Sequence, residues 1–252
     1  MRKNYLNLAK SQERKNIKNN KEIFGREIDS IAEALNLEEE LLTGYYVWYK
    51  LEGQLCKKIY PMSISIIFKN INYLYSSYRL TYMGQYAAAR VIFRNVYESL
   101  IILKAISITE DESLMNEWLD GKDINMRRRI FQNVTEPKSL PMKRFWEDLC
   151  KLCHGTIESN QYSLGFNYRE NMANFVLIEM LLEMNYHVLK EYVTGKGDLA
   201  SISRLIGKES GDITLVQKEK NLLRLFKERR KNWGKESQEI MNDFTIEWKF
   251  TK

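Results

Sequence analysis

The stretch YAAARVIFRNVYESLIILKAI (residues 86–106) decides the fold class, because it is the most hydrophobic segment of the chain and still carries charges. Apolar residues occupy nearly every side of a helix built from it, which is typical of a central, buried helix. Arg90, Arg94 and Glu98 recur at four-residue spacing, so a helix places all three on one face. Buried charges are costly unless they are paired. The sequence therefore predicts that this face is either an internal ion network or the floor of a polar site.

Long stretches without proline or glycine predict that the rest of the chain is helical too. The 252 residues include 3 prolines and 12 glycines, and no alternating strand pattern with hairpin turns stands out. We therefore predict an all-α protein, a helical bundle built around two long hydrophobic helices with a basic C-terminal helical extension. The two long helices are expected over residues 85–108 and 166–193, and the shorter ones over 22–59, 62–82, 111–121, 142–154 and 213–233.

Positive charge is concentrated near the two ends of the chain. The net charge is +6, but residues 1–27 carry +5 and residues 214–235 carry +6, so the remainder is mildly acidic. Such segments can bind nucleic acid, although a solvated surface has the same composition. The predicted parts are a polar N-terminal arm (1–21), a helical-bundle domain (22–197) and a basic C-terminal helical extension (198–252). The candidate nucleic-acid-binding residues of the extension are Lys227, Arg229, Arg230 and Lys231.

The sequence points to a cytoplasmic protein. The first residues, MRKNYLNLAKSQERK, contain no apolar signal core, so export is not expected. Residues 86–106 are long enough to cross a bilayer, but their charges favour a helix inside a protein, and no membrane association is expected. In the cytoplasm the three cysteines are expected to be reduced.

The motif Cys150-Lys151-Leu152-Cys153-His154 has the spacing of a covalent haem attachment site. Haem attachment of this kind follows export, which the N-terminal sequence does not indicate. A zinc site with the distant Cys56 would normally need a second paired motif, and none is present. The two cysteines of the motif are therefore interpreted as small buried hydrophobic residues, and neither a cofactor nor a metal is expected.

Glu179, Glu183, His187 and Glu191 follow one another at four-residue spacing within the second long helix. Di-iron carboxylate proteins instead use glutamate and histidine three residues apart, with a matching second helix. Because neither feature is present, we interpret these four residues as a solvated or interhelical polar face.

The candidate catalytic residues are Arg90, Arg94, Glu98 and His154. Two arginines can hold a phosphate, and a histidine can transfer a proton near neutral pH. His154 ends the helix predicted over 142–154, so it could meet the central helix in space. The alternative is structural: Arg94 and Glu98 form a pair within the helix, and Arg90 bridges to another helix. The sequence leaves both interpretations open.

These residues belong to two motifs that together resemble a known family. Gly84-x-x-Ala87-Ala88-Ala89-Arg90-x-x-x-Arg94-x-x-x-Glu98 is followed by Trp146-x-x-Leu149-x-x-x-Cys153-His154-Gly155. The arrangement, over roughly residues 60–193, is similar to bacterial helical proteins that resemble HEPN domains. The resemblance implies an all-α bundle, often a homodimer, in antiphage defence, toxin–antitoxin or RNA-processing systems. In active members it implies a metal-independent RNase, whose site is an arginine, a polar residue and a nearby histidine on one helix.

The standard HEPN motif is incomplete in this chain. Arg94 and Asn95 match its first half, but Ser99 and Leu100 stand where the histidine would be. We therefore expect a non-catalytic or degenerate HEPN-like module that binds a protein partner or a nucleic acid such as RNA. The alternative is a metal-independent RNase effector in which Arg90 or Arg94 binds phosphate and His154 is the acid–base.

Overall fold

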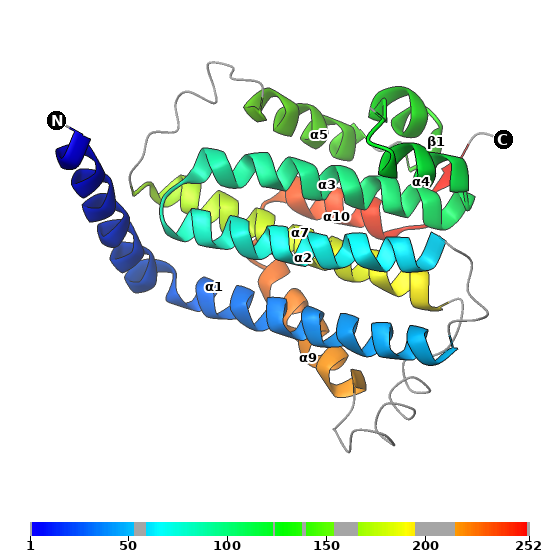
Figure 1. The fold of residues 1–252 in the computed structure, drawn as a ribbon, viewed down its shortest axis with the longest axis horizontal. Helices are drawn as coiled ribbons and strands as arrows, with labels where there is room; N and C mark the ends of the chain where they lie inside the picture. The colour runs from blue at the N-terminus through cyan, green and yellow to red at the C-terminus, as the bar shows by residue number, and fades with distance from the viewer. Residues whose placement is uncertain are drawn as a thin grey trace.

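The protein is an all-α helical bundle, as the sequence predicts (Figure 1). Its centre is formed by α2 (Ile59–Tyr82), α3 (Tyr86–Thr109) and α7 (Tyr168–Thr194), each of which packs against the other two. The helices α3 and α7 are the two long hydrophobic helices expected from the sequence. The computed structural model describes residues 2–52, 59–122, 124–137, 140–153, 166–194 and 215–250.

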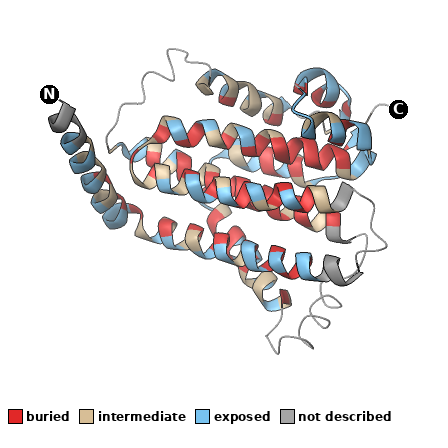
Figure 2. Cartoon of the chain, viewed as in Figure 1, coloured by how far each residue is buried: buried red, intermediate tan, exposed pale blue. Residues whose placement is uncertain are grey.

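The middle of the bundle is apolar, and α3 and α7 contribute the most buried hydrophobic residues to it (Figure 2). In α3 every residue from Leu100 to Ile106 is buried, and all of them except Lys104 are hydrophobic. The helix begins after Gly84, whose φ of 82° is a conformation that glycine adopts without strain. It ends at Glu110, and the Asp111 side chain then accepts a hydrogen bond from the Leu114 amide and caps the next helix. No helix in the described ranges is long and apolar enough to cross a membrane.

The first helix, α1 (Arg2–Glu52), is helical throughout except for a kink at Phe24. Residues 2–21, expected to be a polar arm, thus form the first part of this helix, which extends away from the bundle in Figure 1. The Asn16 and Asn20 side chains are buried and donate hydrogen bonds to the carbonyls of Met83 and Tyr82. These carbonyls end α2, so α1 supplies partners that the last turn of a helix lacks.

Shorter elements cover the central helices. Their bounds are α4 (Glu112–Leu119), η2 (Arg127–Phe131), β1 (Val134–Glu136), α5 (Leu140–Cys153), α9 (Leu215–Arg230), α10 (Lys235–Thr245) and β2 (Lys249–Phe250). The helix α5 packs on α3, α9 packs on α1, and α10 packs on α5 and α7. Strands β1 and β2 form an antiparallel pair.

Candidate functional site

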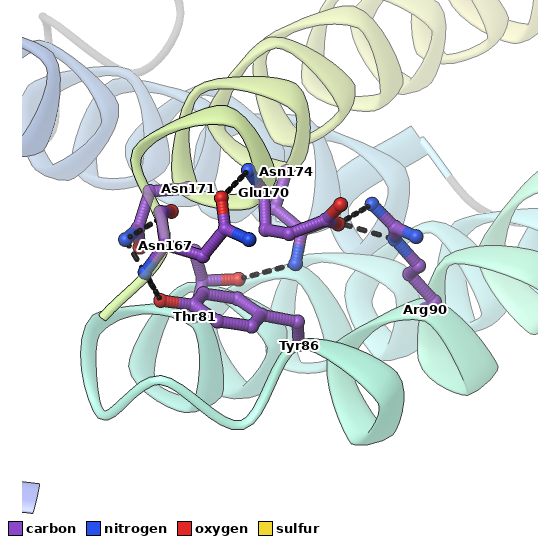
Figure 3. Close-up of polar contacts among 7 residues, drawn as sticks. All are labelled: Thr81, Tyr86, Arg90, Asn167, Glu170, Asn171 and Asn174. Atoms are coloured by element: carbon purple, nitrogen blue, oxygen red, sulfur yellow. Dashed lines mark hydrogen bonds and ion pairs between the residues drawn. The ribbon is translucent and has the colours of Figure 1, made fainter. Parts of the chain in front are cut away.

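Arg90 lies inside the bundle and joins α3 to α7 (Figure 3). Its side chain is 8% exposed and forms an ion pair with Glu170. Its Nε donates to the Asn174 Oδ1 at 3.0 Å, and Asn174 in turn donates to the Thr81 hydroxyl at 3.3 Å. The guanidinium is therefore occupied by partners from α7, and a phosphate could reach it only by displacing Glu170.

The same network continues to Tyr86 at the start of α3 (Figure 3). The Tyr86 hydroxyl accepts hydrogen bonds from the Asn167 amide at 3.1 Å and from the Asn171 Nδ2 at 2.8 Å. Burial raises the pKa of Tyr86, so the hydroxyl is neutral near pH 7. The Asn167 Oδ1 also accepts from the Glu170 amide at 3.2 Å and caps the first turn of α7. The hydrogen bonds and the ion pair of this network hold α3 against α7.

Arg94 and Glu98 have a more open environment than Arg90. Their side chains are 26% and 23% exposed, and the Arg94 Nε donates to the Glu98 Oε1 at 3.0 Å. The indole N–H of Trp146, on α5, donates to the same carboxylate oxygen at 2.8 Å. Glu98 thus holds two side chains from different helices in place. Arg90, Arg94 and Glu98, which the sequence places on one helix face, therefore have two different environments.

Arg94 and Glu98 line a pocket of about 370 Å³ between α2, α3, α4 and α5, which we call the α3 pocket. Its other charged groups are Lys69 and Lys122, both exposed. The buried side chains of Asn70 and Ser99 also line it. Three aromatic rings contribute to its walls: Tyr73, Trp118 and Trp146.

His154, the expected acid–base, lies outside the described residues. Cys56 is outside them as well. Cys150 and Cys153, at the end of α5, are free thiols of intermediate burial, which corrects their interpretation as small buried hydrophobic residues. Burial raises the pKa of both thiols more than the nearby Arg94 lowers it, so both are protonated near pH 7. No group of three or more potential metal ligands occurs among the described residues.

A larger cleft, of about 610 Å³, lies between α7, α9 and α10, and we call it the α9 cleft. Lys227, Arg230 and Lys231 line one side, and Glu183 and His187 of α7 line another. Arg230 binds Glu183 with two bonds, Nε to Oε2 at 2.8 Å and Nη2 to Oε1 at 2.5 Å. The His187 Nε2 is 3.9 Å from the same carboxylate. Three residues expected to bind nucleic acid therefore meet in one cleft.

Arg229, the fourth of these residues, faces the interior instead. Its side chain is 9% exposed and pairs with Glu179 at 2.6 Å and with Glu27 at 3.4 Å. The Trp233 indole also donates to Glu179, at 3.1 Å. Burial raises the pKa of Glu179, although the neighbouring Arg229 lowers it. Arg229 lies on the side of α9 that carries Leu225 and Phe226, which explains why it is inaccessible to a phosphate.

Exposed cations of α9 and of the turn that follows it lie along one side of the helix. Lys220, Arg224, Lys227 and Lys231 are all exposed and are spaced four, three and four residues apart. None of the four forms an ion pair with another described residue. At a rise of about 1.5 Å per residue the row spans roughly 16 Å. We call these four residues the basic stripe; Lys220 and Arg224 are missing from the sequence-based set, although their spacing indicates them.

The acidic face of α7 is interhelical. Glu179 and Glu183 pair with Arg229 and Arg230 of α9, as described above. Glu191 pairs with Lys104 and accepts a bond from the Ser107 hydroxyl at 2.9 Å. Lys104 is 1% exposed and lies under the rings of Phe244 and Trp248, 5.2 and 5.5 Å from their centres. The face therefore joins α7 to α9 and to α3, and its α3 partner Lys104 also contacts the C-terminal rings.

A chain of buried hydrogen bonds leads from the α3 pocket into the core. The Ser99 hydroxyl donates to Asn70 at 2.7 Å, and Asn70 donates to Asn185 at 3.3 Å. Asn185 donates to the Glu38 Oε2 at 3.0 Å, while the Glu38 Oε1 has no partner within the described part of the chain. Burial raises the pKa of Glu38 well above its ordinary value. Glu38 is therefore a buried acid that retains its proton above the usual range.

No protein-family model matches this chain, and neither a curated protein nor a solved structure shows significant similarity to it. The resemblance to HEPN domains therefore stays a prediction from the two sequence motifs.

Proposed function

We propose that the protein is a non-catalytic helical module that binds RNA through the basic stripe and the adjoining α9 cleft. The observation that carries this proposal is the row of four exposed cations, unpaired within the described residues, along one face of α9. One nucleic-acid strand carries a charge about every 3.4 Å along a helix, so a row of roughly 16 Å faces several phosphates.

The cleft beside the stripe supports the same interpretation. Lys227 and Lys231 belong to both, so a strand lying along α9 also meets the mouth of the cleft. Arg230 is already bound to Glu183 and supplies less free positive charge than the lysines. The module would be a degenerate HEPN-like one, acting in a bacterial defence or toxin system, if the motif resemblance holds.

The alternative is a metal-independent RNase. The burial of Arg90 leaves Arg94 as the accessible arginine for this mechanism, with His154 as the acid–base. Incubation of total RNA with the wild type and, separately, with the His154→Ala variant tests the RNase alternative. Cleavage that His154→Ala abolishes and a chelator does not affect would favour the RNase. The binding proposal predicts intact RNA in every sample.

The direct test of the proposal is the salt dependence of RNA binding. The affinity for a labelled single-stranded RNA is measured at several salt concentrations for the wild type and for a variant in which all four stripe cations are glutamine. Each lost phosphate contact should reduce the slope of log affinity against log salt by about 0.7. The stripe variant should therefore bind more weakly and with a shallower slope.

A matched variant controls for the loss of charge alone. Arg79, Arg128, Arg144 and Arg169 are exposed and lie on other elements, so changing them to glutamine removes the same charge elsewhere. This control should retain most of the affinity and slope of the wild type. Equal weakening by both variants, or unchanged binding in the stripe variant, would contradict the proposed surface.

A further inference from the structure

The α3 pocket combines features that the proposed RNA surface does not use. It shares no lining residue with the α9 cleft. Lys69, Arg94 and Lys122 are its cations and Glu98 is its carboxylate, so its lining side chains carry a net formal charge of +2. Neither Lys69 nor Lys122 forms an ion pair with another described residue. The pocket therefore presents positive charge that no protein group in the described ranges compensates.

The shape of the pocket is fixed by hydrogen bonds in its walls. Glu98 accepts from Arg94 and from Trp146, which orients a guanidinium and an indole ring in the same pocket. On another wall, Ser99 donates to Asn70, and both side chains are at least nine-tenths buried. The Ser99 hydroxyl oxygen can still accept a bond from a ligand. Such pre-oriented polar groups are typical of small-molecule sites.

We propose that the α3 pocket binds a nucleoside monophosphate. A phosphate monoester carries about −1.5 to −2 charges at neutral pH, which matches the net charge of the lining. The rings of Tyr73, Trp118 and Trp146 offer faces and edges against which a base can pack. The volume of about 370 Å³ lies within the range of small-ligand sites.

The cations and the rings together select this class of ligand. An inorganic phosphate would leave the aromatic walls without a partner, and an uncharged nucleoside would leave the lysines uncompensated. Lys69 lies over the Tyr73 ring, 5.2 Å from its centre, so charge and aromatic surface are adjacent at the rim. We assign the phosphate to Lys69, Lys122 and Arg94, and the base to the aromatic walls.

Tryptophan fluorescence gives a direct test on the full chain. Of the five tryptophans, Trp118 and Trp146 line the pocket, Trp233 and Trp248 are buried elsewhere, and Trp48 belongs to α1. Titration with AMP, GMP, CMP and UMP should quench the emission saturably for at least one of them. The matching nucleoside and inorganic phosphate should each bind at least about tenfold more weakly. No saturable binding of any monophosphate, or phosphate binding as tightly as the nucleotide, would overturn the proposal.

Two charge variants locate the site. Lys69→Gln/Lys122→Gln changes exposed side chains, so folding should be preserved, and nucleotide affinity should fall at least about tenfold. The control Arg79→Gln/Arg144→Gln removes the same charge from other exposed positions and should bind as the wild type does. Equal affinity in the first variant would overturn the assignment. The stripe variant should bind nucleotide normally, so failure of the RNA proposal and failure of this one are distinguishable.

Discussion

Arg90 and Arg94 are one helical turn apart on α3, and the structure gives them opposite environments. Arg90 is almost fully buried and pairs with Glu170 of α7, while Arg94 is partly exposed, pairs with Glu98 of its own helix and lines the α3 pocket. The difference comes from the neighbouring helices. Next to Arg90, α7 supplies the Glu170 carboxylate and the Asn174 side-chain amide. Next to Arg94, the α3 pocket opens between α2 and α5. Two arginines one turn apart thus have different places in the structure: Arg90 joins two helices, and Arg94 lines a pocket.

The largest expected effect is on the free energy of unfolding, which should differ between alanine variants of the two arginines. Arg90→Ala should lower the free energy of unfolding by about 3 kcal/mol, because it removes one member of a largely buried pair and leaves Asn174 without its donor. Arg94→Ala should cost less than about 1 kcal/mol, since its pair is partly hydrated. Urea unfolding of both variants measures the difference. Similar losses in the two variants would show that the environments are not distinct.

A second test concerns Glu38, a buried acid that has no cation of the described residues paired with it as Arg90 has Glu170. Glu38 is 1% exposed, and its pKa is raised well above 4.5, first by burial and further by Glu183, although the bond from Asn185 lowers it. Below pH 4.5 both the folded and the unfolded protein hold this proton. As the pH rises, the unfolded chain releases the proton first, so stability falls until the folded pKa is reached.

The variant Glu38→Gln should remove this pH dependence. The advantage of the variant over the wild type should grow with pH above about 4.5, by at most about 1.4 kcal/mol per pH unit. Unfolding by urea at pH 5, 6, 7 and 8 measures it. The glutamine oxygen can still accept from Asn185, which limits other effects. A constant difference between the two proteins across this range would mean that Glu38 is ionised in the folded state.

The comparison also shows which features the sequence could predict. The hydrophobicity of residues 100–106, which only Lys104 interrupts, predicts the burial of α3, because apolar side chains lie on nearly every side of that helix. The position of Arg229 was predictable too, since it lies about 200° around α9 from Lys227 and follows Leu225 by four residues. The candidate set instead took the basic residues of 227–231 by their closeness in sequence, which placed Arg229 among the nucleic-acid contacts.

Other features depend on contacts between distant segments. The partner of Arg90 is 80 residues away in sequence, and the indole that binds Glu98 is 48 residues away. Nothing in the local pattern distinguishes the two turns of α3, because each offers an arginine with an apolar neighbourhood. The α3 pocket depends likewise on how α4 and α5 approach the central helices. Spacing identifies the face that carries the charges, and only the packing determines which of them line a pocket.

The smallest expected effect concerns Glu98, which binds both Arg94 and Trp146 in the partly exposed region around the α3 pocket. If Arg94 and Glu98 were fully buried, Glu98→Ala would cost about 3–5 kcal/mol by leaving a charge unpaired. Both side chains are about a quarter exposed, so water can hydrate Arg94, and the expected loss is about 1–2 kcal/mol, mainly from the unpaired Trp146 indole. Glu98→Gln keeps an acceptor for that indole and should lose less. A change in tryptophan emission in the alanine variant but not in the glutamine variant would show that the acceptor oxygen of residue 98 positions the Trp146 ring. Identical stabilities of both variants and the wild type would mean that Glu98 does not hold α5 against α3.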